Sequence, residues 1–297
     1  MRTFEEQVLV QAEKGDRRVS PFLIPMLMAN SSSATVSMRY GFQGPCETTV
    51  TACAASNQSI GNAYNMIIWD RCDAMVTGGT ESALTPTGMA AFANMTALSS
   101  VGISRPFDAE RDGFIQGEGA GVIILEEYES AKRRGATILA ELMGYATSAD
   151  AHHITAPSPG GAGAINCMTL ALADAGIEPG AVTYANAHGT STPLNDAAEA
   201  AAVHAVFGDA GPQVTSIKGI TGHSLGAAGA LEAVSVVESM QRGIIPPTAN
   251  TTALDPELAP IDLVVGEPAE WTPAPAISNS FGFGGHNASL IFGPAPE

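Results

Sequence analysis

The segment at residues 227–237 is apolar on nearly every side of the helix that its composition predicts. Such a helix needs apolar cover all round, and a sheet on each side supplies it. Elsewhere, short strand-like apolar runs alternate with Ala-rich helical runs. This alternation is typical of α/β folds in which helices cover sheets. The sequence therefore predicts a layered α/β architecture with a central layer of helices.

The order of the expected elements follows from the same patterns. We expect helices at residues 54–69, 130–134, 162–175, 197–207 and 227–241. We expect strands at residues 47–52, 74–77, 121–125, 138–144, 182–187, 214–217, 277–280 and 288–292. The Pro- and Gly-rich stretch at residues 156–163 is the best internal boundary. We therefore expect two parts, residues 1–150 and 151–297.

The charge and the cysteine content restrict the classes of partner and compartment. The formal net charge of −17 argues against nucleic acid as the main partner, because phosphate binding needs a basic surface. Dense basic clusters occur only at residues 14–18 and 132–134. No long apolar run predicts a membrane span or a secretory signal. The four cysteines have no paired spacing and fit a reducing cytosol, so we expect a cytoplasmic protein.

A cysteine stands at the junction of a predicted strand and a predicted helix. Cys53 follows the strand at residues 47–52 and precedes the helix at residues 54–69. At a helix N-terminus the macrodipole lowers the pKa of a thiol and favours the nucleophilic thiolate. A buried cysteine is more often a small apolar residue, and this motif alone leaves both interpretations open. The other cysteines lack this setting and are interpreted as packing residues: Cys46, Cys72 and Cys167.

A histidine follows the strand predicted at residues 182–187. His188 opens a loop of glycine and hydroxyl residues, where a ligand can approach. Thr192 before Pro193 is also a good N-cap for the next helix, and both interpretations can hold together. Asp196 is either a carboxylate of this cap region or the partner of a site residue.

A lysine and a second histidine share a loop after the strand at residues 214–217. Lys218 and His223 are five residues apart and could reach one pocket. The small residues that follow allow the next helix to pack closely on a neighbour. Glu232 on that helix could pair with Lys218 or be buried by another partner. A phosphate loop is a weak alternative, because no Lys-Ser or Lys-Thr follows the glycines.

The turn at residues 279–287 contains three glycines around Phe281 and Phe283. Glycines can point backbone N–H groups inward and build an oxyanion hole, although a hairpin turn with two core aromatics is equally compatible. Three of the four motifs place a reactive side chain just after a strand. Ligand sites of α/β sheets gather at these strand ends, so we expect one shared cleft.

These motifs resemble the site of elongating β-ketoacyl–acyl-carrier-protein synthases. The resemblance runs over residues 14–293 in the same order and with similar spacings, and includes the non-catalytic stretches 105–108 and 111–114. It implies the thiolase-like fold, with five αβαβα layers built from two related halves. It also implies about one hundred further residues before residue 1, so we expect an incomplete first half. His286 departs from the family, many members of which have Thr there.

The resemblance implies a role for each motif. Cys53 would take the acyl chain from the carrier as a thioester. His188 and His223 would assist decarboxylation of malonyl-carrier and stabilise the enolate. Lys218 would orient the site electrostatically with Glu232 as its support, and Asp196 would be a further supporting residue. No metal or other cofactor is expected, because the substrates are carried on the phosphopantetheine arm of acyl carrier protein.

The resemblance also implies where the substrate is bound. The backbone N–H groups of Cys53 and Phe283 would form the oxyanion hole, and Phe283 would gate the acyl pocket. The partners implied are acyl carrier protein, docked at Arg17 and Arg18, and a second subunit in a homodimer. The substrate-binding positions implied are Phe92, Thr155, Thr190, Thr192 and Phe281.

The function implied is decarboxylative Claisen condensation in fatty-acid elongation, giving 3-oxoacyl-acyl-carrier protein. A type II polyketide ketosynthase shares this chemistry and is the main alternative. Thiolase would be expected to show a second catalytic cysteine near the C-terminal turn, and no cysteine follows Cys167. A subunit similar to a chain-length factor would lack the nucleophile, so Cys53 counts against it. An inactive fragment is the last alternative.

Overall fold

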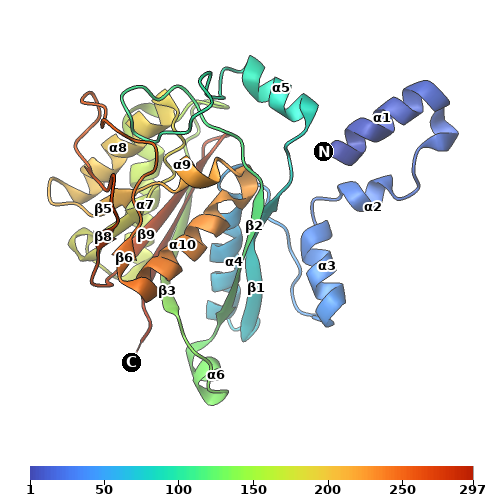
Figure 1. Ribbon diagram of the computed structural model, residues 1–297. Coiled ribbons are helices and arrows are strands. Elements are labelled where there is room, and N and C mark those ends of the chain that lie inside the picture. Colours follow the sequence, from blue (N-terminus) through green and yellow to red (C-terminus); the bar gives the residue numbers. More distant parts are fainter. Residues whose placement is uncertain (297) are drawn as a thin grey trace.

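Two sheets lie on opposite sides of the helices α4 (Ala55–Ile68) and α10 (Ala228–Arg242) in the computed structural model, which describes residues 1–296 (Figure 1). The larger sheet has the strand order β3-β10-β9-β4-β5-β7. Pairing is antiparallel among its first three strands and parallel from β9 onward. Its strands are β3 (Ala140–Ala149), β10 (His286–Pro294), β9 (Ala276–Gly282), β4 (Tyr184–Asn186), β5 (Gln213–Thr215) and β7 (Asp262–Leu263).

The smaller sheet contains the antiparallel strands β1 (Ala74–Glu81) and β2 (Gly119–Glu126). One face packs on α4 and α10. On the opposite face the side chains of Val122 and Ile124 are 60% and 67% exposed.

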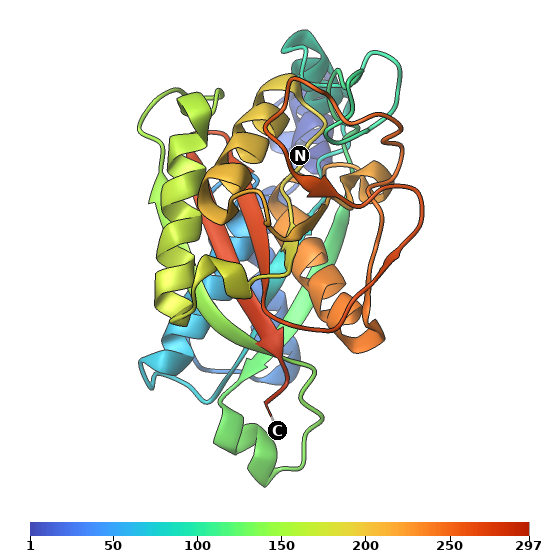
Figure 2. The same ribbon diagram turned by 90° about the vertical axis from the view of Figure 1, so that its left-hand side faces the viewer.

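Two apolar cores fill the two faces of the larger sheet. On one face α7 (Ala162–Ala175) packs against β3, β10 and α8 (Pro193–Phe207), as Figure 2 shows. The opposite face packs on α4 and α10. Gly229 of α10 lies so close to α4 that a Cβ atom on it would be 2.5 Å from Asn57 Oδ1. The layer order is therefore α7/α8, large sheet, α4/α10, small sheet. The predicted layered α/β architecture with a central helix layer is confirmed, and the described residues supply four of the five layers.

The first fifty residues form an arm that extends away from these layers (Figure 1). The arm contains α1 (Arg2–Lys14), the 3-10 turn η1 (Asp16–Arg18), α2 (Leu23–Leu27) and α3 (Ser31–Tyr40). None of its helical residues is buried. Hydrogen bonds from Thr85, the N-cap of α5 (Pro86–Asn94), and from Thr87 within α5 lower the pKa of Glu5, so the beginning of the arm contacts the body.

The remaining elements are short connections. They are α6 (Tyr128–Arg133), α9 (Lys218–Thr221), β6 (Ile244–Ile245), β8 (Ala269–Glu270), and the 3-10 turns η2 (Pro159–Gly161), η3 (Pro179–Ala181) and η4 (Leu225–Ala227). Within residues 1–296, every helix is too short or too polar to cross a membrane.

One predicted strand is wrong. Residues 47–52 form no strand, and Thr51 makes only an isolated bridge with Cys53. The reason is that no strand of the described chain lies beside this segment, so its backbone has no ladder to join. The other expected elements are present, with ends shifted by a few residues. The boundary after residue 150 stays a prediction, although β3 precedes it and pairs with β10.

Candidate active site

The turn before α4 holds Cys53 in a constrained backbone. Ala52 has a φ of 50°, a left-handed conformation that non-glycine residues adopt at a cost. Gly282 at the end of β9 approaches this turn so closely that a Cβ would lie 2.9 Å from Thr51 O and 3.1 Å from Cys53 N. The C-terminal turn and the cysteine turn, more than 200 residues apart in sequence, therefore form one surface.

Two histidines lie beside the thiol. His223 Nε2 is 3.0 Å from Cys53 Sγ, and the ring of His188 meets the ring of His223 edge to face, with centroids 5.3 Å apart. One donor atom from each residue lies within 4.8 Å of the others. All three side chains are buried. The three motifs singled out in the sequence thus converge on one point.

A buried lysine orients His188. Lys218 Nζ forms an ion pair with Glu232 and donates a hydrogen bond to His188 O at 2.5 Å. The same ammonium is 3.4 Å from His188 Nδ1. Because an ammonium group only donates, Nδ1 must accept, and the proton of the neutral ring lies on Nε2. Glu232 is therefore the partner of Lys218, as one of the two interpretations of the sequence proposed.

Glu199 on α8 is a site residue that sequence reasoning missed. Its carboxylate accepts hydrogen bonds from His188 N and Gly189 N, both at 2.7 Å. Burial raises the pKa of Glu199 to about 7, and the two amides oppose that rise. A signal was available, because Glu199 is the single glutamate in a run of alanines at residues 197–202. A lone carboxylate on an otherwise apolar helix requires buried partners.

The electrostatic state of the thiol corrects one expectation. Burial raises the pKa of Cys53 to about 11, and Lys218 and the backbone N–H groups of Phe283 and Cys53 only partly oppose it. The predicted lowering by the helix N-terminus is absent because α4 begins at Ala55, and burial outweighs the dipole. Burial and Lys218 hold the pKa of both His188 and His223 well below 6.5. Both rings are therefore neutral, and His223 is placed to accept the thiol proton.

This electrostatic state predicts how the thiol reacts with a small reagent. Because only the thiolate is nucleophilic, alkylation of Cys53 by iodoacetamide should accelerate about hundredfold between pH 7 and pH 9. Peptide mass spectrometry after timed quenching measures the rate at Cys53 alone. The Cys53→Ala variant accounts for labelling elsewhere, including at the exposed Cys46. A rate that is flat above pH 7 would instead indicate the lowered pKa predicted from the sequence.

A cavity of about 1270 Å³ opens onto the thiol and both histidines. The substrate-binding positions expected from the sequence all line it: Phe92, Thr155, Thr190, Thr192 and Phe281. Phe283 lines it too and is 38% exposed. Lys218 and Glu232 lie behind the histidines instead. Asp196 is also outside the lining, and its carboxylate accepts a hydrogen bond from Phe107 N at 2.8 Å.

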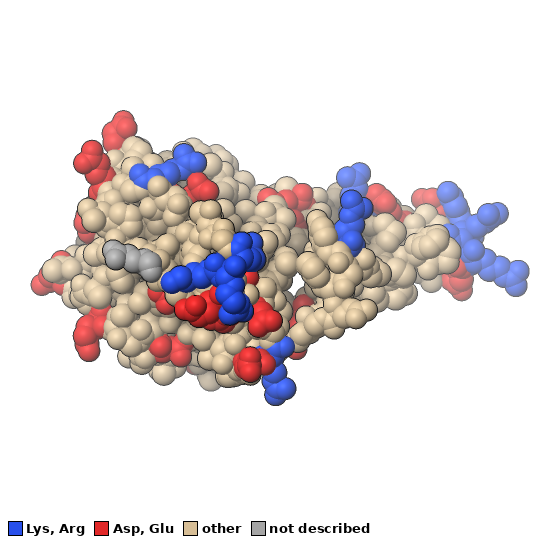
Figure 3. Space-filling model, turned by 90° about the horizontal axis from the view of Figure 1, so that it is seen from below, with Lys and Arg blue, Asp and Glu red and all other residues tan. Residues whose placement is uncertain are grey.

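The expected docking residues do not line this cavity. Arg17 and Arg18 are exposed on η1, at the outer end of the arm, where Figure 3 shows a cluster of basic side chains. The second basic cluster, on and just after α6, is partly neutralised. Arg134 pairs with Glu126 at 2.7 Å, and the ammonium of Lys132 lies over the Tyr128 ring.

Family models match most of the chain. The model described as "Beta-ketoacyl synthase, N-terminal domain" matches residues 1–131, and "Beta-ketoacyl synthase, C-terminal domain" matches residues 139–252. The 3-oxoacyl-acyl-carrier-protein synthase 2 of Synechocystis sp. is 46% identical over 98% of this chain and 72% of its own length. The mitochondrial 3-oxoacyl-acyl-carrier-protein synthase of Arabidopsis thaliana is 49% identical over 94% of this chain and 63% of its own length.

Solved structures have the same fold. A structure of "the ishigamide ketosynthase/chain length factor" aligns with a TM-score of 0.94 at 37% identity, over 99% of this chain and 72% of that one. A β-ketoacyl synthase from Burkholderia phymatum aligns with a TM-score of 0.93 at 38% identity, over 98% and 72%. A type II polyketide ketosynthase in complex with its acyl-carrier protein aligns with a TM-score of 0.95 at 33% identity. The alignment covers 99% of this chain and 75% of that one. Sequence matches along most of the chain, around a buried cysteine with two histidines, show that it belongs to the β-ketoacyl synthase family.

Proposed function

We propose that this chain catalyses decarboxylative Claisen condensation of an acyl thioester on Cys53 with malonyl-acyl-carrier protein, giving 3-oxoacyl-acyl-carrier protein in fatty-acid elongation. The observation that carries the proposal is the contact of Cys53 and two neutral histidines at the wall of one cavity. The 3-oxoacyl-acyl-carrier-protein synthases among its relatives support the substrate class.

The first step is acyl transfer. Cys53 Sγ gives its proton to His223 Nε2, 3.0 Å away, and attacks the carbonyl carbon of the acyl thioester. The bond to the carrier sulfur breaks, and the carrier thiolate takes the proton back from His223. Splitting the condensation through a covalent acyl-enzyme makes each step easier.

The second step is decarboxylation. The bond between the malonyl carboxylate and the α-carbon breaks, carbon dioxide leaves, and the electron pair forms an enolate of the thioester. The Nε2 proton of His188, fixed by Lys218 at Nδ1, is available to the enolate oxygen. Once Cys53 is acylated its sulfur has no proton to donate, so neutral His223 can carry its own proton on Nε2 and supply a second donor there. Preorganised donors in a buried site stabilise such a charge strongly.

The third step joins the two substrates. The α-carbon attacks the acyl carbonyl on Cys53, and negative charge develops on its oxygen. The N–H groups of Phe283 and Cys53, which already act on the thiol, are the donors for this oxyanion. Collapse of the intermediate releases 3-oxoacyl-carrier and the Cys53 thiolate, which takes one proton from water to restore the thiol.

We further propose that the reaction needs no metal. The donor atoms of Cys53, His188 and His223 are close enough to meet at one ion. The ammonium of Lys218 beside His188 disfavours a second cation there. A cytoplasmic location and a homodimer complete the proposal, and sedimentation of the purified chain tests the dimer.

The experiment that tests the function combines acyl-carrier and malonyl-carrier with the chain. Carbon dioxide release and the mass of the carrier-bound product are measured together. A 3-oxoacyl product two carbons longer than the loaded acyl group supports the proposal. The second candidate, a type II polyketide ketosynthase, is favoured by the type II polyketide ketosynthase complex among the solved structures. Repeated condensation without reduction of the product would favour it.

Carrier docking at Arg17 and Arg18 gives a separate prediction. The chain is strongly acidic, so a local basic cluster is needed to attract an acidic carrier. Replacing both arginines with glutamate should raise KM for carrier-borne substrates about tenfold at low salt, with a weaker salt dependence. KM for small thioesters should not change.

The matched control for this prediction is the cluster near α6. Changing Arg133 and Lys132 to glutamate alters the net charge equally but not the arm. Steady-state kinetics at two salt concentrations compare the variants. An equal effect on both substrate types, or a larger effect from the control, would rule out docking at the arm.

A further inference from the structure

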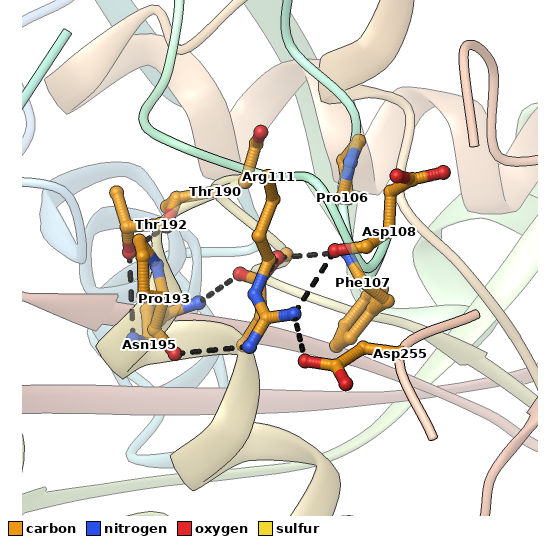
Figure 4. Close-up of polar contacts among 12 residues, drawn as sticks. Pro106, Phe107, Asp108, Arg111, Thr190, Thr192, Pro193, Asn195 and Asp255 are labelled. Carbon is orange, nitrogen blue, oxygen red and sulfur yellow. Dashed lines mark hydrogen bonds and ion pairs between the residues drawn. The ribbon is translucent and has the colours of Figure 1, made fainter. Parts of the chain in front are cut away.

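Arg111 lies where three segments that are far apart in the sequence meet: its own loop, the first turn of α8 and the loop that contains Asp255 (Figure 4). Its Nη1 donates to the Asp255 carboxylate at 2.6 Å and to Asp108 O at 3.0 Å. Its Nη2 donates to Pro193 O at 3.3 Å, and its Nε is 3.8 Å from the Asp196 carboxylate. The side chain is only 6% exposed. One guanidinium therefore links the loop at residues 105–114 to the first turn of α8 and to the loop that contains Asp255.

The link to the loop at residues 250–255 is reinforced by the backbone. The carboxylate of Asp108 accepts hydrogen bonds from Thr252 N at 2.8 Å and Ala253 N at 3.1 Å. In return, Asp255 N donates to Phe107 O at 3.0 Å. These hydrogen bonds fix the two loops to each other, so that Arg111 is held in place where it contacts Pro193.

The third segment is the cavity wall that follows His188, and its backbone is constrained. Ser191 has a φ of 69°, in the left-handed region. The loop at residues 105–114 holds it there, because Arg105 N donates to Ser191 Oγ at 2.9 Å and Gly113 N donates to Ser191 O at 3.0 Å. A non-glycine residue keeps such a conformation only where its surroundings impose it.

This constraint places two hydroxyl groups on the cavity wall. Thr190 and Thr192 flank Ser191, line the cavity, and their Oγ1 atoms are 2.9 Å apart. Pro193, whose carbonyl Arg111 holds, is the next residue. Arg111 does not line the cavity, so any effect on a substrate passes through this wall.

The chemistry of the side chain suits this task better than that of lysine. A planar guanidinium donates in several fixed directions, whereas an ammonium group concentrates its donors at one point. Asp196 is fully buried and Asp255 is largely buried, so the cation also balances carboxylates that have little access to water.

We propose that Arg111 is a positioning residue for the thioester-bearing arm of the substrate, acting by holding the wall Thr190–Pro193 in place. The proposal rests on the proposed function, because that function supplies a carrier-borne substrate to this wall. Arg111 takes no part in the chemistry at Cys53 under this proposal, because Cys53 lines the cavity and Arg111 does not.

The test compares Arg111→Lys with Glu110→Gln in the full chain. Glu110→Gln removes the exposed ion pair of Arg105 in the same loop and is the matched control. For Arg111→Lys we expect KM for malonyl-carrier to rise about tenfold, with kcat within about twofold, because the wall loses its fixed geometry. Alkylation of Cys53 by iodoacetamide should be unchanged. Glu110→Gln should match the unmodified chain in all three measurements.

Asp255→Asn is the second variant, in case Arg111→Lys does not fold. It keeps a hydrogen-bond acceptor for Arg111 but removes one charge, so it should raise KM in the same direction by a smaller factor. Either folded variant decides the proposal. An unchanged KM, a loss confined to kcat, or slower alkylation of Cys53 would overturn it.

Amide hydrogen exchange separates this proposal from the proposed function. Amides of residues 188–196 and of Gly113 should exchange about tenfold faster in Arg111→Lys and at the unmodified rate in Glu110→Gln. If the unmodified chain condenses no substrate, the proposed function fails, and exchange still decides whether Arg111 holds the wall. Unchanged exchange would overturn the positioning role.

Discussion

Replacing Cys53 with alanine should abolish condensation, with a fall of at least about 10³-fold in kcat, because no other group can carry the acyl chain. Decarboxylation of malonyl-carrier should survive, since that step depends on the histidines. Incubation with acyl-carrier, followed by peptide mass spectrometry, should find the acyl group on Cys53 of the unmodified chain and on no cysteine of the variant.

Cys167→Ala is the control for the nucleophile. Cys167 is also fully buried, but it lies between α7 and the large sheet, where its thiol donates to Ala146 O. Its replacement should leave acyl loading intact. An acyl adduct on Cys72 or Cys167, with Cys53 unmodified, would contradict the assignment of the nucleophile.

Replacing His188 with alanine should slow decarboxylation about 10²-fold to 10³-fold, because the enolate loses a preorganised donor. Acyl loading should change by only a few-fold, since the thiol is hydrogen-bonded to His223 and not to His188. Replacing His223 should slow both steps, because its Nε2 is the group beside Cys53 Sγ and the thiol pKa is raised. A lowered Cys53 pKa, as expected from the sequence, would have let the thiol ionise without a base. Both histidines would then act only in decarboxylation and condensation.

Two separate assays distinguish these outcomes. Carbon dioxide release from malonyl-carrier reports decarboxylation, and the acyl-enzyme formed in a single turnover reports loading. The pair of variants serves as its own control, because the two rings are in contact and equally buried. Normal loading in His223→Ala would show that the thiol ionises without this ring.

The sequence was sufficient to predict the residues that meet at the site. Cys53, His188 and His223 each lie at or shortly after the predicted end of a strand, which the neighbouring residues mark clearly, and the structure brings all three together. The extended segment before Cys53 was not predicted correctly. Its apolar and β-branched residues favour a strand, but a strand also needs a partner, which local sequence does not reveal.

Long-range polar partners were also hidden in the sequence. Glu199 accepts hydrogen bonds from backbone N–H groups, and the identity of a residue does not reveal which side chain its backbone will bind. Arg111 contacts the first turn of α8 and the loop that contains Asp255, and only the tertiary fold brings these together. The thiol pKa depends on burial, which a helix position alone does not determine.

The position of β10 affects how this protein is made. The strand lies between β3 and β9, so the large sheet has a gap until residues 286–294 have left the ribosome. The turn that supplies the Phe283 amide also precedes this strand directly. Pairings across such long stretches of chain form slowly and leave intermediates exposed to aggregation. A nascent chain thus carries Cys53 without the amide that completes its surroundings until the segment from Phe283 to the end of β10 has been synthesised.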